Sequence, residues 1–515
     1  MKRLTAIALV LALLTALFAG CAREAPETTT EPTPERPALL AENIPDDNCR
    51  NWYEIFVYSF ADSDGDRVGD LKGATEKLDY VRDMGFTGIW LMPIMPSPSY
   101  HKYDITDYYA IDPLYGTLED FQAFLNRAHE LGIRVILDLV VNHTSNEHPW
   151  FQNAKTGADT QYRDYYNFTD TAASGYQQIG GSYYEARFVS SMPDLNLDNP
   201  AVRAEIVNIM KFWLDKGVDG FRLDAVTSYY TGQQAKNVEF LSWLNTEAKA
   251  IDPDCYIVGE CWADESTIAG YYASGIDSFF CFPAAGGNGE LCKLMAEEAT
   301  DRGTAYGNLT AHLEERFGAD TLMAPFLDNH DMDRITGTIG TYNLNRLKIT
   351  YGLLAMMRGG TYIYYGDEIG MIGSGNDPNK RIGMYWSTLD QVTRCPPGTT
   401  ESKYVLANVP DQQADANSLL NYVRSAMNLR NAVPEIARGT SEVVDTGNSS
   451  VCVIRRTWEG RTVTIVLNIA DTPVDLTVEA GELLGTLDAN VESGSDITFA
   501  DGSLHLDPWG IAVLE

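Results

Sequence analysis

The feature that most constrains the fold of this 515-residue chain is a repeated alternation of short apolar runs with amphipathic stretches. Between residues 70 and 85, for example, Leu71, Ala74 and Leu78 recur at the spacing of one helix face. Eight strand–helix units predict parallel strands that close into a (β/α)8 barrel. An open doubly wound sheet is the alternative, but no glycine-rich phosphate loop follows the first strand. The strand candidates are residues 53–60, 85–93, 134–141, 220–225, 255–260, 278–283, 322–330 and 361–368.

Two stretches depart from this alternation. Residues 143–198 lack a long apolar period and are rich in Tyr, Asn, Gly and Asp, which indicates an excursion inserted after the third strand. Near the C-terminus, Val463, Ile465 and Leu467 alternate on one face, as in antiparallel strands. We therefore expect an α/β fold: a (β/α)8 TIM barrel over residues 47–142 and 199–433, an inserted domain over 143–198, and a C-terminal antiparallel β-sandwich over 434–515.

The N-terminus has the pattern of a secretory signal. A basic "MKR" precedes a long apolar run and the small pair Ala19-Gly20, and Cys21 follows as in a bacterial lipobox. We expect residues 1–21 to be a lipoprotein signal with Cys21 lipidated; a plain cleaved signal and a transmembrane anchor are the alternatives. Residues 22–46, rich in Pro, Thr and Glu, predict a disordered tether. The expected location is the extracellular face of the bacterial cell membrane, or the medium if the signal is simply cleaved.

Charge and cysteine content narrow the functional classes. A formal net charge of −34 argues against nucleic-acid binding, which needs cations against phosphate. The eight cysteines include Cys21 and are widely scattered, with neither metal-type spacing nor a dense disulfide framework. We expect most of them to be small buried residues. The expected contact with the membrane is through a lipid anchor only, and we expect a monomer.

The segment "DGFRLDAV" (219–226) places two charges inside an apolar strand. Alternate side chains of a strand share a face, so Arg222 and Asp224 point together to the side opposite Phe221 and Leu223. A buried ion pair would explain them, although such pairs are weak evidence for stability. The other explanation is a polar site at the end of a strand.

Polar residues at the ends of other predicted strands favour the polar site. In a barrel these ends meet at one rim, where catalytic groups lie. Among them, Asp224 beside Arg222 should stay ionised, and Glu260 among other carboxylates should hold a proton, as glycoside cleavage requires. Metal-dependent hydrolysis is the alternative, but His143 and His330 are each single. The strand-end residues are Asp138, Asn142, His143, Arg222, Asp224, Glu260, His330 and Asp331.

These segments carry a resemblance to a known family. "DLVVNH" (138–143), "GFRLDAV", "VGE" (258–260) and "FLDNHD" (326–331), in that order, resemble the four signature segments of the α-amylase family of retaining glycosidases (glycoside hydrolase family 13). "MPDLN" (192–196) is similar to the family's fifth segment. The resemblance implies that Asp224 is the nucleophile, that Glu260 is the acid and then the base, and that Asp331 steadies the distorted sugar ring.

The same resemblance implies a set of substrate contacts. Arg222, His143 and His330 would hold the sugar at the cleaved bond. "HKYDITDYY" (101–109) resembles the family's segment after the second strand, which would make Tyr103 a stacking platform and Asp104 a support for Arg222. Arg334 is a candidate subsite contact or a surface ion pair.

An acidic cluster follows the first predicted strand. Asp62, Asp64, Asp66 and Asp70 place four carboxylates within nine residues, and such a cluster repels itself unless a hard cation lies within it. The segment resembles the calcium loop of many family members, in which Val68 would contribute its carbonyl. A solvated acidic loop is the alternative. A second calcium site of secreted α-amylases is expected to be absent or altered, because "DAVTSYY" has Thr-Ser where those enzymes carry Lys-His.

The expected function is endo-acting hydrolysis of α-1,4-glucosidic bonds in starch, glycogen or maltodextrins. Exo-acting α-1,6-glucosidases tend to have an acidic residue three before the tyrosine of "YD", and here that position is Tyr100. The enzymatic alternatives are a neopullulanase-like or cyclomaltodextrinase-like enzyme, a 4-α-glucanotransferase and an oligo-α-1,6-glucosidase. A non-catalytic glucan-binding surface protein is disfavoured, because all three carboxylates are present.

Overall fold

The computed structural model describes residues 44–515 apart from 297–298, 341–342, 388–391 and 491–495. The predicted signal with Cys21, and the predicted tether as far as residue 43, lie outside the described residues. Within the described residues, no helix combines the length and the apolar character that crossing a bilayer requires. The seven described cysteines are all unpaired, and five of them are buried.

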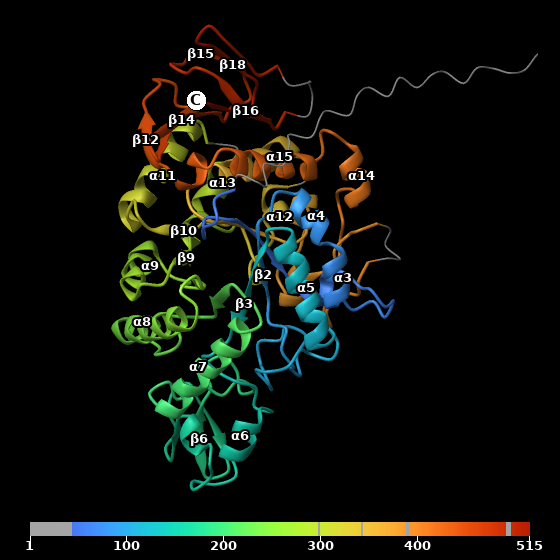
Figure 1. Ribbon diagram of the computed structural model, residues 1–515, viewed down its shortest axis with the longest axis vertical. Coiled ribbons are helices and arrows are strands. Elements are labelled where there is room, and N and C mark those ends of the chain that lie inside the picture. Colours follow the sequence, from blue (N-terminus) through green and yellow to red (C-terminus); the bar gives the residue numbers. More distant parts are fainter. Residues whose placement is uncertain (1–43, 297–298, 341–342, 388–391, 491–495) are drawn as a thin grey trace, which may run out of the picture. The chain divides into compact units, whose positions relative to one another are not determined.

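Eight parallel strands form the central sheet, as predicted for a TIM barrel (Figure 1). The sheet runs in the order β10-β9-β8-β7-β3-β2-β1-β11. A single parallel bridge between Phe326 and Tyr362 joins the two outer strands, so the sheet closes on itself. The strands are β1 (Asn51–Ile55), β2 (Gly88–Leu91), β3 (Arg134–Leu139), β7 (Gly220–Leu223), β8 (Tyr256–Gly259), β9 (Ser278–Phe280), β10 (Leu322–Ala324) and β11 (Thr361–Tyr364).

Amphipathic helices follow the strands. α5 begins with a capping box, in which the Thr117 hydroxyl accepts the N–H of Asp120 while the Asp120 carboxylate accepts the N–H of Thr117. The α-helices in the described part of the chain are α2 (Val57–Phe60), α3 (Leu71–Glu76), α4 (Leu78–Asp83), α5 (Leu118–Glu130), α6 (Pro149–Ala154), α7 (Pro200–Leu214), α8 (Gln234–Ile251), α9 (Glu265–Tyr271), α10 (Glu290–Lys293), α11 (Arg302–Phe317), α12 (Ile335–Ile339), α13 (Leu344–Ala355), α14 (Val409–Ala414), α15 (Leu419–Ala432) and α16 (Glu435–Arg438).

Two sequence-based expectations about these elements were wrong in detail. The first strand ends at Ile55, and the rest of the predicted run forms the short helix α2. Every residue of both elements is buried, and an apolar run buried on all sides has no period that separates strand from helix. The helical pattern over residues 70–85 is divided between α3 and α4, with Lys77 at the junction.

The chain between β3 and α7 forms a small three-stranded antiparallel sheet next to α6, in the teal-to-green part of Figure 1. Isolated bridges pair His143 with Asp194 and Tyr166 with Leu195, so the start and end of this excursion are held together. Aromatic contacts of Phe151 with Tyr166 and other rings fill its small interior. The strands are β4 (Phe168–Thr169), β5 (Tyr176–Ile179) and β6 (Ser182–Glu185), in the order β4-β6-β5.

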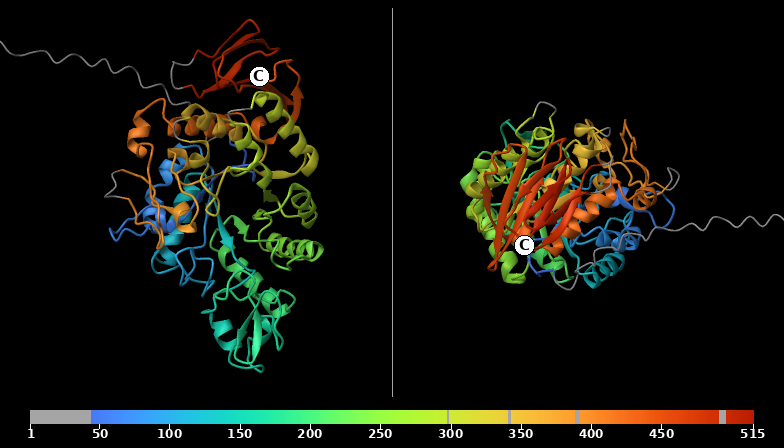
Figure 2. Two further views of the ribbon diagram at one scale, coloured as in Figure 1. Left: turned by 180° about the vertical axis from the view of Figure 1, so that it is seen from behind. Right: turned by 90° about the horizontal axis from the view of Figure 1, so that it is seen from above.

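Two antiparallel sheets end the chain, and Figure 2 shows their strands side by side in red. A separate apolar core contains Val466 and Leu514 from the larger sheet and Leu504 and Leu506 from the smaller one. The opposite face of β14 carries Ile465, which belongs to the main buried cluster of the barrel. The larger sheet comprises β12 (Thr440–Val444), β13 (Val451–Trp458), β14 (Arg461–Asn468), β19 (Gly510–Leu514) and β16 (Leu483–Asp488); the smaller comprises β15 (Val474–Thr477), β18 (Ser503–Leu506) and β17 (Thr498–Ala500).

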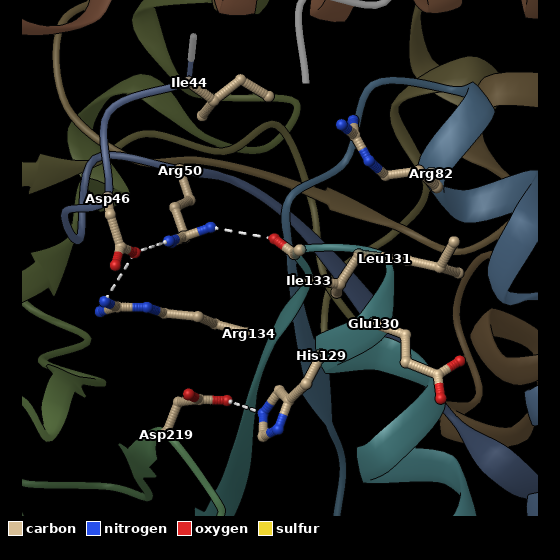
Figure 3. Close-up of a pocket in the computed structure, with 11 residues that line it drawn as sticks. Ile44, Asp46, Arg50, Arg82, His129, Glu130, Leu131, Ile133, Arg134 and Asp219 are labelled. Atoms are coloured by element: carbon tan, nitrogen blue, oxygen red, sulfur yellow. Dashed lines mark hydrogen bonds and ion pairs between the residues drawn. The ribbon is translucent and has the colours of Figure 1, made fainter. Parts of the chain in front are cut away.

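A charged hollow of about 610 Å³, drawn in Figure 3, lies beside the amino ends of β1, β3 and β7. Arg50 donates to the carbonyl oxygens of Thr87 and Gly132, at 3.1 and 3.2 Å. The Asp46 carboxylate accepts from both Arg50 and Arg134, at 2.6 and 2.9 Å. The Arg50 side chain is only 6% exposed, whereas that of Asp46 is 82% exposed. These contacts tie the segment before β1 to the base of the barrel.

We expect Arg50→Met to lower the free energy of unfolding by about 2–4 kcal/mol, because buried carbonyl oxygens lose charged donors. Asp46→Ala removes only the solvent-exposed partner and should cost less than about 1 kcal/mol. Calorimetric melting of both variants beside the natural protein measures the difference. Equal melting temperatures for the two variants would show that Arg50 does not hold the base of the barrel.

Candidate active site

Three carboxylates from separate strands line one hollow at the carboxyl ends of the barrel strands. Asp224 follows β7, Glu260 follows β8, and Asp331 lies in the loop after β10. The hollow has a volume of about 370 Å³, so it suits a small ligand. Its lining residues are His101, Tyr103, His143, Phe188, Met192, Asp224, Ala225, Thr227, Ser228, Glu260, Trp262, Asp331, Asp377 and Arg381.

A single arginine holds two of these carboxylates together. Arg222 Nη1 lies 2.8 Å from Asp224 Oδ1, and Arg222 Nη2 lies 3.1 Å from Glu260 Oε2. Arg222 is fully buried, and its guanidinium also faces the Trp90 ring at 5.0 Å. The two terminal nitrogens of one planar guanidinium fix the two acidic groups beside each other. The charges of "DGFRLDAV" are therefore a buried ion pair and part of a polar site at once.

The support for Arg222 comes from Asp138 and not from Asp104, so that part of the sequence-based prediction was wrong. Asp138 accepts from Arg222 Nη1 with both oxygens, at 2.8 and 2.9 Å, and its side chain is fully buried. Asp104 instead accepts the hydroxyls of Ser97 and Ser99 within its own loop. Asp138 lies on β3, whose register pairs it directly with Arg222 on β7.

The backbone after Asp224 is strained in a way that serves the site. Ala225 has a φ of 45°, in the left-handed region that residues with a Cβ rarely adopt. In this conformation its N–H donates to Glu260 Oε2 at 2.9 Å. The sharp turn at the end of β7 thus connects the two carboxylates a second time, as strained residues at functional sites often do.

Burial and neighbouring charges shift the pKa values of Glu260 and Asp331 in opposite directions. Burial raises the pKa of Glu260 to about 7; Arg222 opposes this rise, and Asp224 and Asp331 reinforce it. Burial would also raise the pKa of Asp331, but the His330 and Arg381 cations outweigh burial and hold it well below its usual range. Near neutral pH, Glu260 can hold a proton while Asp331 is ionised.

The two predicted histidines occupy different positions. His143 lines the hollow, and its Nε2–H donates to the Tyr103 carbonyl oxygen at 3.2 Å. His330 is fully buried behind the hollow, with Nδ1 on Glu54 and Nε2 near the Tyr103 hydroxyl and Asp331. Burial lowers the pKa of His330, but Asp331 and Glu54 outweigh it and raise the pKa to about 9. His330 is thus a buried cation that positions Asp331 and Tyr103.

Tyr103 lies where a stacking platform was predicted. Its ring lines the hollow and stacks on the imidazole of His330, with centroids 5.4 Å apart and an interplanar angle of 14°. Its hydroxyl donates to Asp138 at 3.0 Å, so the tyrosine joins the network around Arg222.

Arg334 does not line the hollow. Its side chain is fully buried and pairs with Asp367 at 2.7 Å, so neither a surface ion pair nor a substrate contact describes it. The arginine at the hollow is Arg381, which donates to Asp331 Oδ1 and Asp377 Oδ1, each at 2.8 Å. Sequence reasoning missed Arg381 because it lies in a long connection after β11 with no apolar period.

An acidic side chain does lie beside Tyr100 at the hollow. Its hydroxyl donates to the carboxylate of Asp377, which lines the hollow. The connection after β11 thus supplies, next to position 100, the carboxylate that position 100 itself lacks. Two exposed aromatic side chains also line the hollow: Phe188 is 49% exposed and Trp262 is 53% exposed. Sequence reasoning missed both residues, because an exposed aromatic side chain is recognisable only in the folded chain.

The acidic loop after β1 brings three of its four carboxylates together. Asp62, Asp64 and Asp70 each offer an oxygen, and these oxygens lie within 4.8 Å of one another. Asp66 is not among them; it accepts the N–H of Val68 at 2.6 Å. Three converging carboxylate oxygens are the donor type that Ca²⁺ prefers.

Comparison with known proteins gives one consistent family. The family model "Alpha amylase, catalytic domain" matches residues 54–439. Alpha-amylase 3 of Dictyoglomus thermophilum is 39% identical over 429 residues, covering 81% of this chain and 84% of that protein. A glucan 1,6-alpha-glucosidase of Streptococcus pneumoniae is 32% identical, covering 83% of this chain and 92% of that protein. The solved structure of Eubacterium rectale Amy13B has a TM-score of 0.86 and 41% identity, covering 92% of this chain and 96% of that chain.

The raised pKa of Glu260 predicts the alkaline limit of activity. If Glu260 donates a proton, kcat/KM should be retained up to about pH 7 and should fall as the pH rises through that value, because the acid is then lost. Glu260→Gln should lower kcat by about 100-fold or more and remove this alkaline limb. Initial rates on maltoheptaose between pH 4 and 10 test both. A natural enzyme whose activity fell above about pH 4.5 would have its acid elsewhere.

Proposed function

Because the chain belongs to the α-amylase family of glycoside hydrolases, we propose that it cleaves α-1,4-glucosidic bonds of starch, glycogen or maltodextrins within the chain and with retention of configuration. The observation that carries this proposal is the shared guanidinium of Arg222, which holds Asp224 and Glu260 beside each other in the lining of a sugar-sized hollow. Retaining glycosidases need two carboxylates about 5–5.5 Å apart, closer than inverting ones.

Each carboxylate has its own part in the proposed reaction. Asp224, paired with Arg222, attacks the anomeric carbon and forms a covalent glycosyl-enzyme. Glu260 gives its proton to the glycosidic oxygen, so the leaving sugar departs as an alcohol. Glu260 then takes a proton from water, whose oxygen attacks the anomeric carbon and releases Asp224. Asp331, held ionised by His330 and Arg381, accepts hydrogen bonds from sugar hydroxyls and favours the distorted ring.

A second candidate is exo-acting cleavage of short α-glucosides. Asp377 and Arg381 place a charged pair at the hollow on the side of Tyr100, which could close the hollow beyond the first sugar. One relative, at 32% identity, is a glucan 1,6-alpha-glucosidase. We favour the α-1,4 activity because the relative with 39% identity is an alpha-amylase.

Digestion of maltoheptaose separates these candidates. We expect a mixture of short maltooligosaccharides from the earliest times, with the new reducing ends first in the α configuration by proton NMR. Glucose alone as the first product would favour exo-action, and products longer than maltoheptaose without new reducing ends would indicate a glucanotransferase. A first product in the β configuration would exclude the retaining mechanism. Isomaltooligosaccharides and pullulan, as parallel substrates, report on α-1,6 activity.

We also propose that the acidic loop binds one Ca²⁺ through Asp62, Asp64 and Asp70, with the Val68 carbonyl completing the site. Three carboxylates within 4.8 Å repel one another unless a cation neutralises them. The part of the ion would be structural, because Asp70, one of its ligands, also caps α3 by accepting the N–H of Gly73. A cation here would fix the loop against α3.

Chelation should therefore lower the melting temperature, and added Ca²⁺ should restore it. At a calcium concentration 100 times Kd, the bound ion should raise the free energy of unfolding by about 2.7 kcal/mol. Asp64→Asn should remove the calcium response. Asp66→Asn is the matched control, because the Asp66 carboxylate is directed to the N–H of Val68. A natural protein whose melting curve ignores both chelator and calcium would refute the site.

The lipid anchor is proposed on sequence grounds. The signal pattern ending at Cys21, followed by a Pro- and Glu-rich stretch, supports an enzyme held at the extracellular face of the cell membrane by lipid alone. Such a location suits a polymeric substrate that cannot cross the membrane.

A further inference from the structure

Glu54 is a buried carboxylate that the proposed reaction steps do not use. It lies on β1, where every residue is buried, and it is itself only 1% exposed. Its carboxylate contacts the side chain of His330, with Oε1 2.5 Å from Nδ1. Because a buried charge is costly unless it is paired, Glu54 and His330 have to be considered as one unit.

The other ring nitrogen of His330 faces two oxygens. Nε2 lies 2.7 Å from the Tyr103 hydroxyl oxygen and 3.2 Å from Asp331 Oδ2. The single hydrogen of the Tyr103 hydroxyl is donated to Asp138 Oδ2, at 3.0 Å. The hydroxyl oxygen can therefore only accept from His330, and an ionised Asp331 can only accept as well. Both contacts require a hydrogen on Nε2.

A hydrogen is needed on Nδ1 too, because an ionised Glu54 offers only acceptors. A histidine that donates from both ring nitrogens is an imidazolium. His330 then donates to Tyr103, and Tyr103 donates to Asp138. Asp138 in turn accepts from Arg222. The hydrogen on Nδ1 thus fixes the direction of a series of hydrogen bonds that ends at the central guanidinium.

The charge of His330 depends on Glu54 more than on its other neighbours. Burial alone would favour the neutral ring, and the carboxylates of Glu54 and Asp331 oppose it. Asp331 is also paired with Arg381, whereas in the described part of the chain Glu54 forms an ion pair with His330 alone. The charged and titratable groups around the Glu54–His330 pair are Tyr103, Asp138, Arg222, Asp331 and Arg381.

We propose that Glu54 is a positioning residue for the reaction: its carboxylate keeps His330 protonated on both nitrogens, and His330 then orients Asp331 and Tyr103. Glu54 acts through His330, since it does not line the hollow itself. A neutral residue at position 54 would leave His330 with one hydrogen, so either the contact of Nδ1 or the contacts of Nε2 would be lost. This inference rests on the proposed function and adds a residue to its machinery.

The protonation of His330 can be measured without substrate. Nitrogen-15 chemical shifts distinguish an imidazolium from a neutral ring, and the absence of one set of signals in His330→Asn identifies this histidine among the seven. We expect both ring nitrogens of His330 in the natural enzyme to stay protonated from about pH 5 to about pH 8. In Glu54→Gln, one nitrogen should lose its proton within that range, because loss of the anionic partner lowers the pKa of His330 from about 9.

Turnover gives a second readout. On maltoheptaose, kcat should fall about tenfold or more in Glu54→Gln while KM changes less than about threefold, because the orientation of Asp331 matters most in the transition state. Glu368→Gln is the matched control: Glu368 is also fully buried, but it accepts from the hydroxyls of Tyr53 and Tyr80. Its kcat should stay within about twofold of the natural value, and its His330 signals should not move.

A neutral His330 in the natural enzyme at pH 7 would overturn the inference, whether or not Glu54→Gln folds. Unchanged His330 signals and kcat in Glu54→Gln would also overturn it, as would an equal loss of kcat in Glu368→Gln. A natural enzyme that is inactive on maltoheptaose would instead contradict the proposed function, and the ring signals would still report on Glu54 and His330.

Discussion

The buried guanidinium of Arg222 is the interaction on which the catalytic end of the barrel depends. It contacts Asp138, Asp224 and Glu260 from three neighbouring strands, so one cation sets the distances among the acidic groups. Uncompensated, a buried charge of this kind is expensive, and three carboxylates without it would repel one another. Replacing it by an apolar side chain would therefore disrupt the site and the strand ends together.

Around this centre, each acidic group acquires a distinct state from its surroundings. Burial among other carboxylates raises the pKa of Glu260 toward neutral pH, whereas His330 and Arg381 keep Asp331 ionised. The barrel makes such differences possible because its strands deliver side chains from distant parts of the chain to one rim. The same scaffold then leaves the loops free to shape the hollows above that rim.

The site residues that directly follow recognisable strands could be predicted from the sequence. The site residues that distant loops bring to the hollow could not. The eight strands were recognisable because each is a short buried run, and Asp224 and Glu260 because each directly follows such a run. The partner of Arg222 was assigned to Asp104 instead of Asp138, because strand register cannot be read from spacing within one segment. Arg381 and Asp377 come from an irregular connection, so no periodicity marks them.

The closure of the barrel leaves one uneven seam. β10 and β11 are joined by the single bridge between Phe326 and Tyr362, while the other neighbouring strands share continuous ladders. Local opening of a protein begins where the fewest hydrogen bonds must break. Asp331 lies five residues beyond that bridge, so amide hydrogens along this junction would exchange with solvent earlier than those around Arg222. The loop that carries Asp331 thus follows the least continuously paired edge of the barrel.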